Sequence, residues 1–141
     1  KGSNGGIFCS SHDGLVTRNE VRNITDFGML LYGDRITASY NKIDQPKTLW
    51  APAIVIVDSN YAEVVYNEIY DRAGSASRDS IVVYGPNSYN HIAFNHIENS
   101  VRYAVAISAS SCVGNIVEGN DIVGSGTIHN VGTSTVVRNN T

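Results

Sequence analysis

Short runs of apolar residues return along the whole chain, and an asparagine between small or aliphatic residues follows each run. The apolar runs cover residues 7–9, 29–32, 54–57, 81–84, 105–107 and 128–131. The asparagines are Asn19, Asn41, Asn67, Asn95, Asn120 and Asn139, which lie 22, 26, 28, 25 and 19 residues apart in turn. A near-regular spacing that tolerates insertions predicts a stacked repeat rather than one globular core.

Each repeat contains three short apolar or mixed segments separated by bends, and the asparagine occupies one of these bends. Asparagine tolerates the left-handed backbone conformation of a sharp bend, and its side-chain amide can bond to the next copy about 4.8 Å away. We therefore expect the asparagines to form an amide ladder. A second, partly filled ladder is expected four positions later, at Asn23, Gln45, Asp71 and Asn99.

The main competing repeat is the leucine-rich repeat, which needs aliphatic residues five and eight positions before the asparagine. Five positions before, this chain has Gly14, Ile36, Ala62, Asn90, Asn115 and Ser134. The Asn-x-Ile-x-x-Asn spacing instead resembles the repeats of the pectin-lyase-like superfamily over almost the whole chain. The resemblance implies an all-β fold, a right-handed parallel β-helix (solenoid) of about six coils. Neither end shows a capping segment, so residues 1–141 are expected to be one segment of a longer helix, open or capped by other chains.

Composition limits the possible partners. The 141 residues are 42% hydrophobic and 16% charged, with a formal net charge of −3. No basic stripe is present to neutralise phosphates, so a nucleic-acid partner is not expected. No apolar stretch has the length of a membrane span, so a membrane partner is not expected either. The four histidines fall at different positions of the repeat, and we expect no metal site and no cofactor.

Two surface columns follow from the repeat. The residues just before three successive asparagines are Tyr40, Tyr66 and Phe94, which we expect to stack at the edge of the bend. Stacking of this kind is structural, with sugar binding as the alternative. The residues just after the asparagines are Glu20, Lys42, Glu68, His96, Asp121 and Asn140, which indicate a solvated face.

The strand formed by the apolar run is apolar on both faces. Its outward positions are Leu30, Val55, Val82 and Ala106. Strands buried on both sides read as continuous hydrophobic runs, so either long loops or neighbouring subunits should cover this face. Pectin-lyase-like enzymes place their cleft along this strand, with acidic and basic groups at the outward positions. No acid occupies these positions here, so the catalytic pattern of the family is not matched.

Charged and aromatic residues gather instead in the long bends that lead into this strand. Candidate substrate-binding residues are Lys47, Trp50, Arg72, Arg78, Arg102 and Tyr103, and candidate catalytic carboxylates are Asp71 and Asp79. Flat rings beside arginines suit a carbohydrate groove, and two carboxylates about 5 to 9 Å apart can act as general acid and base. The alternative is that these charges only pair with one another in surface loops.

Asp34 and Asp58 follow the same strand in adjacent repeats and form a second candidate carboxylate pair. Turn formation is the alternative role of both residues.

The resemblance implies a polysaccharide-recognising segment, most similar to those of phage tailspikes and of polysaccharide lyases or epimerases. Whether it is an enzyme stays open; if catalytic, it would be of the polysaccharide lyase or glycoside hydrolase type. Tailspikes are trimers, so the resemblance also implies a homotrimer located outside the cell or on a phage tail. The alternative is a non-catalytic trimeric stalk or adhesin segment.

Overall fold

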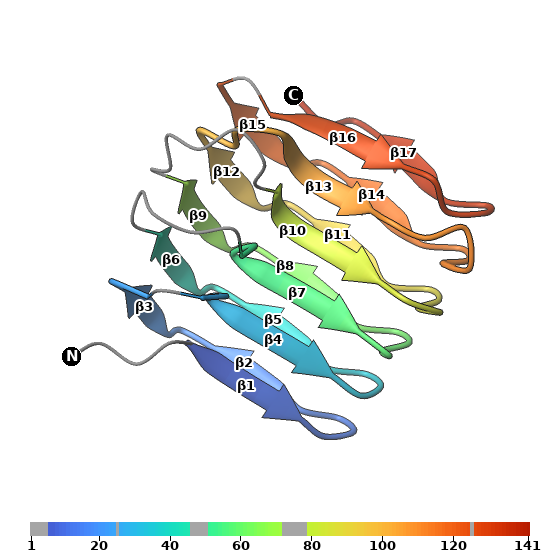
Figure 1. Ribbon diagram of the computed structural model, residues 1–141, viewed down its shortest axis with the longest axis horizontal. Helices are drawn as coiled ribbons and strands as arrows, with labels where there is room; N and C mark the ends of the chain where they lie inside the picture. Colours follow the sequence, from blue (N-terminus) through green and yellow to red (C-terminus); the bar gives the residue numbers. More distant parts are fainter. Residues whose placement is uncertain (1–5, 25, 46–50, 72–78, 125) are drawn as a thin grey trace.

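The computed structural model describes residues 6–24, 26–45, 51–71, 79–124 and 126–141, and in this part of the chain every regular element is a β-strand. The strands form three parallel sheets that run along the stack of coils (Figure 1). Sheet A contains β1 (Ile7–Ser10), β4 (Met29–Tyr32), β7 (Ile54–Val57), β10 (Asp79–Tyr84), β13 (Tyr103–Ile107) and β16 (Thr127–Asn130). Sheet B contains β2 (Leu15–Thr17), β5 (Thr37–Ser39), β8 (Glu63–Val65), β11 (His91–Ala93), β14 (Ile116–Glu118) and β17 (Val136–Arg138). Sheet C contains β3 (Glu20–Arg22), β6 (Lys42–Gln45), β9 (Glu68–Asp71), β12 (His96–Glu98) and β15 (Asp121–Val123).

Each strand pairs in parallel with the equivalent strand of the next coil, so Leu31 is opposite Ile56 and Ile56 is opposite Val83. The chain therefore winds as a solenoid, and the predicted all-β parallel solenoid is confirmed. No helix of the described residues has the length and apolarity that a membrane span requires.

The core lies inside the coils, where the alternation of the strands directs every second side chain. Fully buried members from sheet A are Met29, Leu31, Ile54, Ile56, Ile81, Val83, Val105 and Ile107. Sheet C adds Ile43, Ile69 and Ile97, and sheet B adds Ala38, Val64, Ile92 and Val117. Because equivalent positions stack on one another, the core is one continuous column along the solenoid.

The predicted asparagine ladder is present at the bend between sheets B and C. The backbone N–H and Nδ2 of Asn67 both donate to Asn95 Oδ1 at 2.9 Å, and Nδ2 also donates to Ala38 O at 2.9 Å in the previous coil. The same pattern joins Asn41 to Asn67 and Asn95 to Asn120. Each buried amide is thereby saturated, which removes the cost of leaving polar groups unpaired.

The left-handed residue of this bend is not the asparagine, as the sequence analysis predicted, but the residue before it. Tyr40, Tyr66 and Phe94 have φ values of 55°, 56° and 55°. A left-handed residue turns the chain sharply, so that its own side chain points outward and the next side chain points into the bend. This geometry directs the ring to solvent and the amide to the ladder.

The last ladder member is Asn140 and not Asn139. Strand β14 pairs with β17 with Glu118 opposite Arg138, which places Asn140 next to Asn120. The backbone N–H and Nδ2 of Asn120 donate to Asn140 Oδ1 at 3.0 and 2.8 Å, whereas Asn139 has a φ of 53° and is exposed. The spacing of the final repeat is therefore one residue longer than the sequence analysis predicted.

This register predicts different effects for two neighbouring glycine substitutions. Asn140→Gly should lower the free energy of unfolding by about 1 to 2 kcal/mol, because it removes the acceptor of two ladder bonds. Asn139→Gly should be nearly neutral, since glycine adopts a positive φ without strain. Urea denaturation of both variants checks the register, and a larger loss for Asn139→Gly would contradict it.

Two members of the second predicted ladder, Asn23 and Asn99, do not take part in one. Asn23 and Asn99 have φ values of 54° and 61° and exposed side chains, so both act as turn residues. A different second ladder, missed from the sequence, lies at the bend between sheets A and B. There Asn90 N–H and Nδ2 donate to Asn115 Oδ1 at 2.9 and 3.0 Å. This ladder could have been predicted from the sequence, because Asn90 and Asn115 occupy equivalent positions in adjacent repeats.

The outer face of sheet A is partly covered by the chain itself. Val55, Val82 and Ala106 point away from the core cluster, yet their exposed fractions are 7%, 0% and 1%. In the same face Phe8, Tyr32 and Tyr84 remain exposed. The sequence left two possible covers for this face, long loops or neighbouring subunits. Residues of the same chain are sufficient to bury Val55, Val82 and Ala106, so association is not needed to cover them.

Candidate functional site

An open hollow of about 520 Å³ lies where sheet A leads into sheet B in the first three coils. Its lining comes from the ends of β1, β4 and β7 and the turns after them, which project at one edge of the stack (Figure 1). The lining residues are Ser10, Ser11, His12, Tyr32, Gly33, Asp34, Asp58 and Asn60. Equivalent turns of stacked coils repeat about every 4.8 Å, so the hollow runs along the solenoid axis. It contains both members of the predicted pair Asp34 and Asp58.

Asp34 is held in its ionised form by the next coil. Its Oδ1 accepts the backbone N–H of Asn60 at 2.9 Å and Asn60 Nδ2 at 3.0 Å. These bonds hold the pKa of Asp34 below its ordinary value, and the nearby His12 and Arg35 lower it further. An ionised carboxylate suits a base or an electrostatic contact rather than the role of a general acid.

His12 lies beside Asp34 at the mouth of the hollow. The backbone N–H of Asp34 donates to His12 Nδ1 at 3.3 Å, while the same nitrogen is 3.7 Å from Asp34 Oδ2. The two contacts require opposite roles of Nδ1, and the shorter one favours Nδ1 as acceptor with the proton on Nε2. With 68% of its side chain exposed, the imidazole can offer this Nε2–H to a ligand.

The nearest arginine is directed away from the hollow. Arg35 donates from Nε to Asp13 Oδ1 and from Nη2 to Asp13 Oδ2, the latter at 3.0 Å. This two-pronged pairing raises the pKa of Arg35 and lowers that of Asp13. The described residues that line the hollow include no lysine or arginine. Asp34 and Asp58 therefore give the hollow a negative charge.

Glycine keeps room for the second carboxylate. Asp58 is exposed at a φ of 45°, and a Cβ added to Gly85 of the next coil would lie 3.3 Å from Asp58 Oδ1. Gly85 itself has a φ of 82°, which disfavours other residues. Tyr32, half-exposed on the outer face of sheet A, also lines the hollow.

Asp79 and Arg102 are brought together, but they bind each other. Arg102 donates from Nε and Nη2 to the two carboxylate oxygens of Asp79 at 2.7 and 2.6 Å. The Asp79 side chain is only 3% exposed, and the bond to it raises the pKa of Arg102. The guanidinium also lies 5.1 Å from the Tyr103 ring, which stacks on His129 at 4.6 Å between centroids. This arrangement agrees with the alternative that charges of the bends pair among themselves.

The remaining predicted site residues divide into two groups. Asp71 lies in β9 and is 1% exposed, so it does not line an open groove. Lys47, Trp50, Arg72 and Arg78 lie outside the described residues. Within the described residues, no group of three His, Cys, Asp or Glu side chains is placed to hold a metal ion.

Two stacked aromatic columns flank the outer face of sheet B. Tyr40, Tyr66 and Phe94 stack as predicted, with centroids 5.3 Å apart and interplanar angles of 7° and 15°. Tyr61 and Tyr89 form a second column at the same 5.3 Å spacing, which the sequence analysis missed. Stacked rings cover each other's faces and expose their edges, whereas a sugar ring packs on a face. The geometry therefore favours the structural role of both columns.

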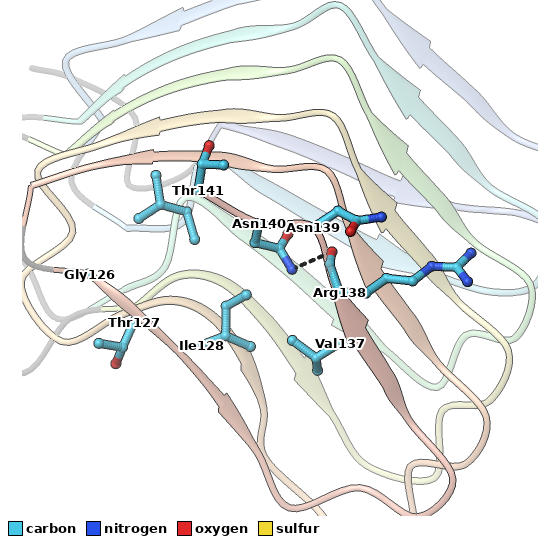
Figure 2. Close-up of a pocket in the computed structure, with 9 residues that line it drawn as sticks. Gly126, Thr127, Ile128, Val137, Arg138, Asn139, Asn140 and Thr141 are labelled. Carbon is cyan, nitrogen blue, oxygen red and sulfur yellow. Dashed lines mark hydrogen bonds between the residues drawn. The ribbon is translucent and has the colours of Figure 1, made fainter.

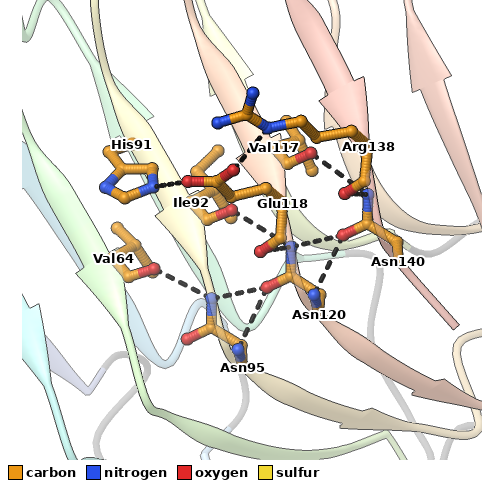
Figure 3. A network of polar contacts seen from close by, with 9 residues as sticks. All are labelled: Val64, His91, Ile92, Asn95, Val117, Glu118, Asn120, Arg138 and Asn140. Carbon is orange, nitrogen blue, oxygen red and sulfur yellow. Dashed lines mark hydrogen bonds and ion pairs between the residues drawn. The ribbon is translucent and has the colours of Figure 1, made fainter.

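A polar network crosses three strands of sheet B (Figure 3). Glu118 accepts His91 Nε2 at 3.0 Å and Arg138 Nε at 2.6 Å, close to the asparagine ladder. The two donors, Arg138 first, hold the pKa of Glu118 below its ordinary value of about 4.5. The network joins three consecutive coils.

This shift predicts a pH-dependent contribution to stability. A depressed carboxylate pKa stabilises the fold above the ordinary pKa and loses this effect as the pH falls through the lower, folded-state pKa. Glu118→Gln should therefore lower the urea midpoint at neutral pH, and the difference from the parent should disappear under acidic conditions. The exposed Glu63 of the same sheet provides the control Glu63→Gln. A pH-independent difference would contradict the assignment.

A second hollow, of about 480 Å³, lies in the last coil (Figure 2). Its apolar lining, Ile122, Ile128 and Val137, continues the inward column of the core, and Asn140 belongs to the ladder. Among the described residues of the lining, the one charged side chain is that of Arg138, which is bound by Glu118, and no carboxylate or histidine side chain is present.

The comparisons with known proteins agree with the geometry. A family model described as "Right handed beta helix region" matches residues 1–141. Neither a curated protein nor a solved structure matches the chain. The family match fits the superfamily whose repeats the sequence resembles, and it covers the full stack of coils described above. The chain therefore belongs to the right-handed β-helix family.

Proposed function

We propose that this β-helix recognises a polysaccharide, which lies along the stacked turns that form the hollow of Tyr32, Asp34 and Asp58. The observation that carries the proposal is the composition of the hollow: one half-exposed ring, two carboxylates, an imidazole N–H and hydroxyl groups come from three consecutive coils. Hydroxyl-rich chains need many such donors and acceptors together with a flat apolar face. The axial repeat suits an extended chain.

Other expectations from the sequence analysis stay predictions. Lys47, Trp50, Arg72 and Arg78, which lie outside the described residues, stay predicted sugar-binding residues. Cleavage by a lyase or a glycosidase would use Asp34 as base and Asp58 as its partner, since Asp34 is held ionised. Assembly as a homotrimer, and a location outside the cell or on a phage tail, belong to the same proposal.

A glycan array that contains neutral, acidic and cationic polysaccharides tests this function. The parent chain should bind at least one class, and Tyr32→Ala should weaken that binding about fivefold or more, because a sugar-stacking ring contributes about a kcal/mol. Tyr40→Ala is the matched control, since Tyr40 is an exposed tyrosine in the column on the other side of the coil.

Two outcomes would count against the proposal. If the chain binds no glycan, the non-catalytic stalk or adhesin becomes the better interpretation. If binding occurs but Tyr32→Ala and Asp34→Asn leave it unchanged, the binding surface lies elsewhere on the solenoid.

A further inference from the structure

We propose that the sugar unit accepted by the hollow carries a protonated amine, so that the ligand is an amino-sugar polymer with free amino groups rather than a uronate. This inference rests on the proposed function, because it names the chemistry of the glycan for the same hollow. It differs from the expectation from the sequence, which placed arginines beside the glycan.

The first argument is the charge of the lining. Asp34 keeps one carboxylate oxygen, Oδ2, free of Asn60, whose two donors both bind Oδ1. Asp58 is exposed in the next coil. Two carboxylates in one open hollow attract a cation and repel another carboxylate. A uronate would therefore be disfavoured and an ammonium group favoured.

The second argument is that two arginines are already paired with carboxylates: Arg35, which follows Asp34 in the chain, and Arg102, which the sequence analysis assigned to sugar binding. The guanidinium group of Arg35 binds the carboxylate of Asp13, with Nη2 at 3.0 Å from Oδ2. The guanidinium group of Arg102 binds the two carboxylate oxygens of Asp79. Bidentate binding of a uronate carboxylate requires a guanidinium group that is not already paired. Among the described residues, neither arginine can offer it without breaking a charged pair.

The third argument is the position of the tyrosine ring. Tyr32 and Tyr84 stand on either side of Val57 in the register of sheet A, and Asp58 follows Val57 directly. The second carboxylate thus lies between two coils that each carry a half-exposed tyrosine. Aromatic faces attract ammonium groups as well as the apolar face of a sugar. A ring beside a carboxylate can hold both parts of an amino sugar.

Binding measurements with three defined oligosaccharides test the inference. The probes are glucosamine oligomers, the same oligomers fully N-acetylated, and oligogalacturonate, each titrated by calorimetry near neutral pH. The glucosamine oligomer should bind about tenfold more tightly than the acetylated one, because acetylation removes the charge. Oligogalacturonate should not bind, and added salt should weaken the glucosamine complex.

Variants locate the effect. Asp58→Asn should weaken glucosamine binding about tenfold while leaving the acetylated oligomer unchanged, because only the charged group uses the carboxylate. Asp121→Asn, at an exposed carboxylate of sheet C, is the matched control and should have no effect. Thermal melting of each variant shows that the fold is retained.

The possible failures separate this inference from the proposed function. If the acetylated oligomer or oligogalacturonate binds as tightly as the glucosamine oligomer, and Tyr32→Ala still removes that binding, the hollow takes a glycan but does not select an amine. If Asp121→Asn weakens binding as much as Asp58→Asn, the attraction is a general effect of the acidic chain and the inference is overturned. If none of the probes and no glycan of the array binds, both proposals fail.

Discussion

Replacing Asn67 by leucine is expected to lower the free energy of unfolding by about 3 to 5 kcal/mol, because several buried groups lose their partners at once. Asn67 Oδ1 accepts the N–H and Nδ2 of Asn41 at 3.0 and 2.9 Å. Its own Nδ2 donates to Ala38 O and to Asn95 Oδ1, both at 2.9 Å. Leucine satisfies none of these groups, and no water reaches them at a position that is 1% exposed.

Urea denaturation followed by circular dichroism measures this loss. Asn130→Leu is the matched control, since Asn130 is exposed and, within the described part of the chain, its side chain accepts only the backbone N–H of Gly132, at 2.9 Å. Its expected cost is about 1 kcal/mol or less. A loss below half a kcal/mol for Asn67→Leu would show that the ladder contributes little to stability.

Val82→Glu is expected to have a comparable effect, a loss of about 3 to 5 kcal/mol, although Val82 points away from the core. Its exposed fraction is 0%, so the carboxylate would be buried without a designed partner. Among the described residues, Arg102 already binds Asp79, the first residue of the same strand, through two nitrogens. If a neighbouring subunit covered this face, which was one of the two covers expected from the sequence, the change would break association. Because the chain itself buries Val82, the structure predicts a loss of stability instead.

Leu30→Glu is the matched control, because Leu30 is the outward neighbour of Val55 in β4 and is only half-buried. It should cost much less, and its effect should not depend strongly on pH. Val82→Glu should recover part of its stability when acid protonates the new carboxyl group. Equal midpoints for the two variants, in urea at neutral pH, would show that the cover over Val82 is loose.

The fold could be predicted because its information repeats. Each copy of the asparagine unit has the same neighbours, and stacking makes equivalent residues contact one another, so an error in one copy does not change the architecture. The stacking of Tyr40 on Tyr66 followed from the same reasoning. The left-handed residue was assigned one position too late, because asparagine and its predecessor are both compatible with a bend, and only the hydrogen bonds decide which side chain turns inward.

The site was harder to predict because charge pairing depends on the lengths of the bends. Asp79 and Arg102 are in different coils, and their contact required the register that places Asp79 opposite Tyr103. Asp34 and Asp58 were found because both follow the same strand in adjacent repeats. The positions of Tyr32 and His12 recur in the other repeats. Nothing in the sequence marks which of the corresponding turns enclose a hollow and which are filled by side chains.

By itself, then, the sequence determined the parallel solenoid, the direction of the core residues and the ladder of amides. Side chains alternate with a period of two within a strand, and the asparagine recurs in every repeat. Together these two patterns leave few other ways to bury the apolar runs. The tertiary structure alone decided that Asn140 rather than Asn139 closes the ladder, that Val82 is covered, and that Arg35 and Arg102 are bound by carboxylates. The physical reason is register: a shift of one residue moves a side chain to the opposite face of its strand, and only the pairing of neighbouring coils fixes that shift.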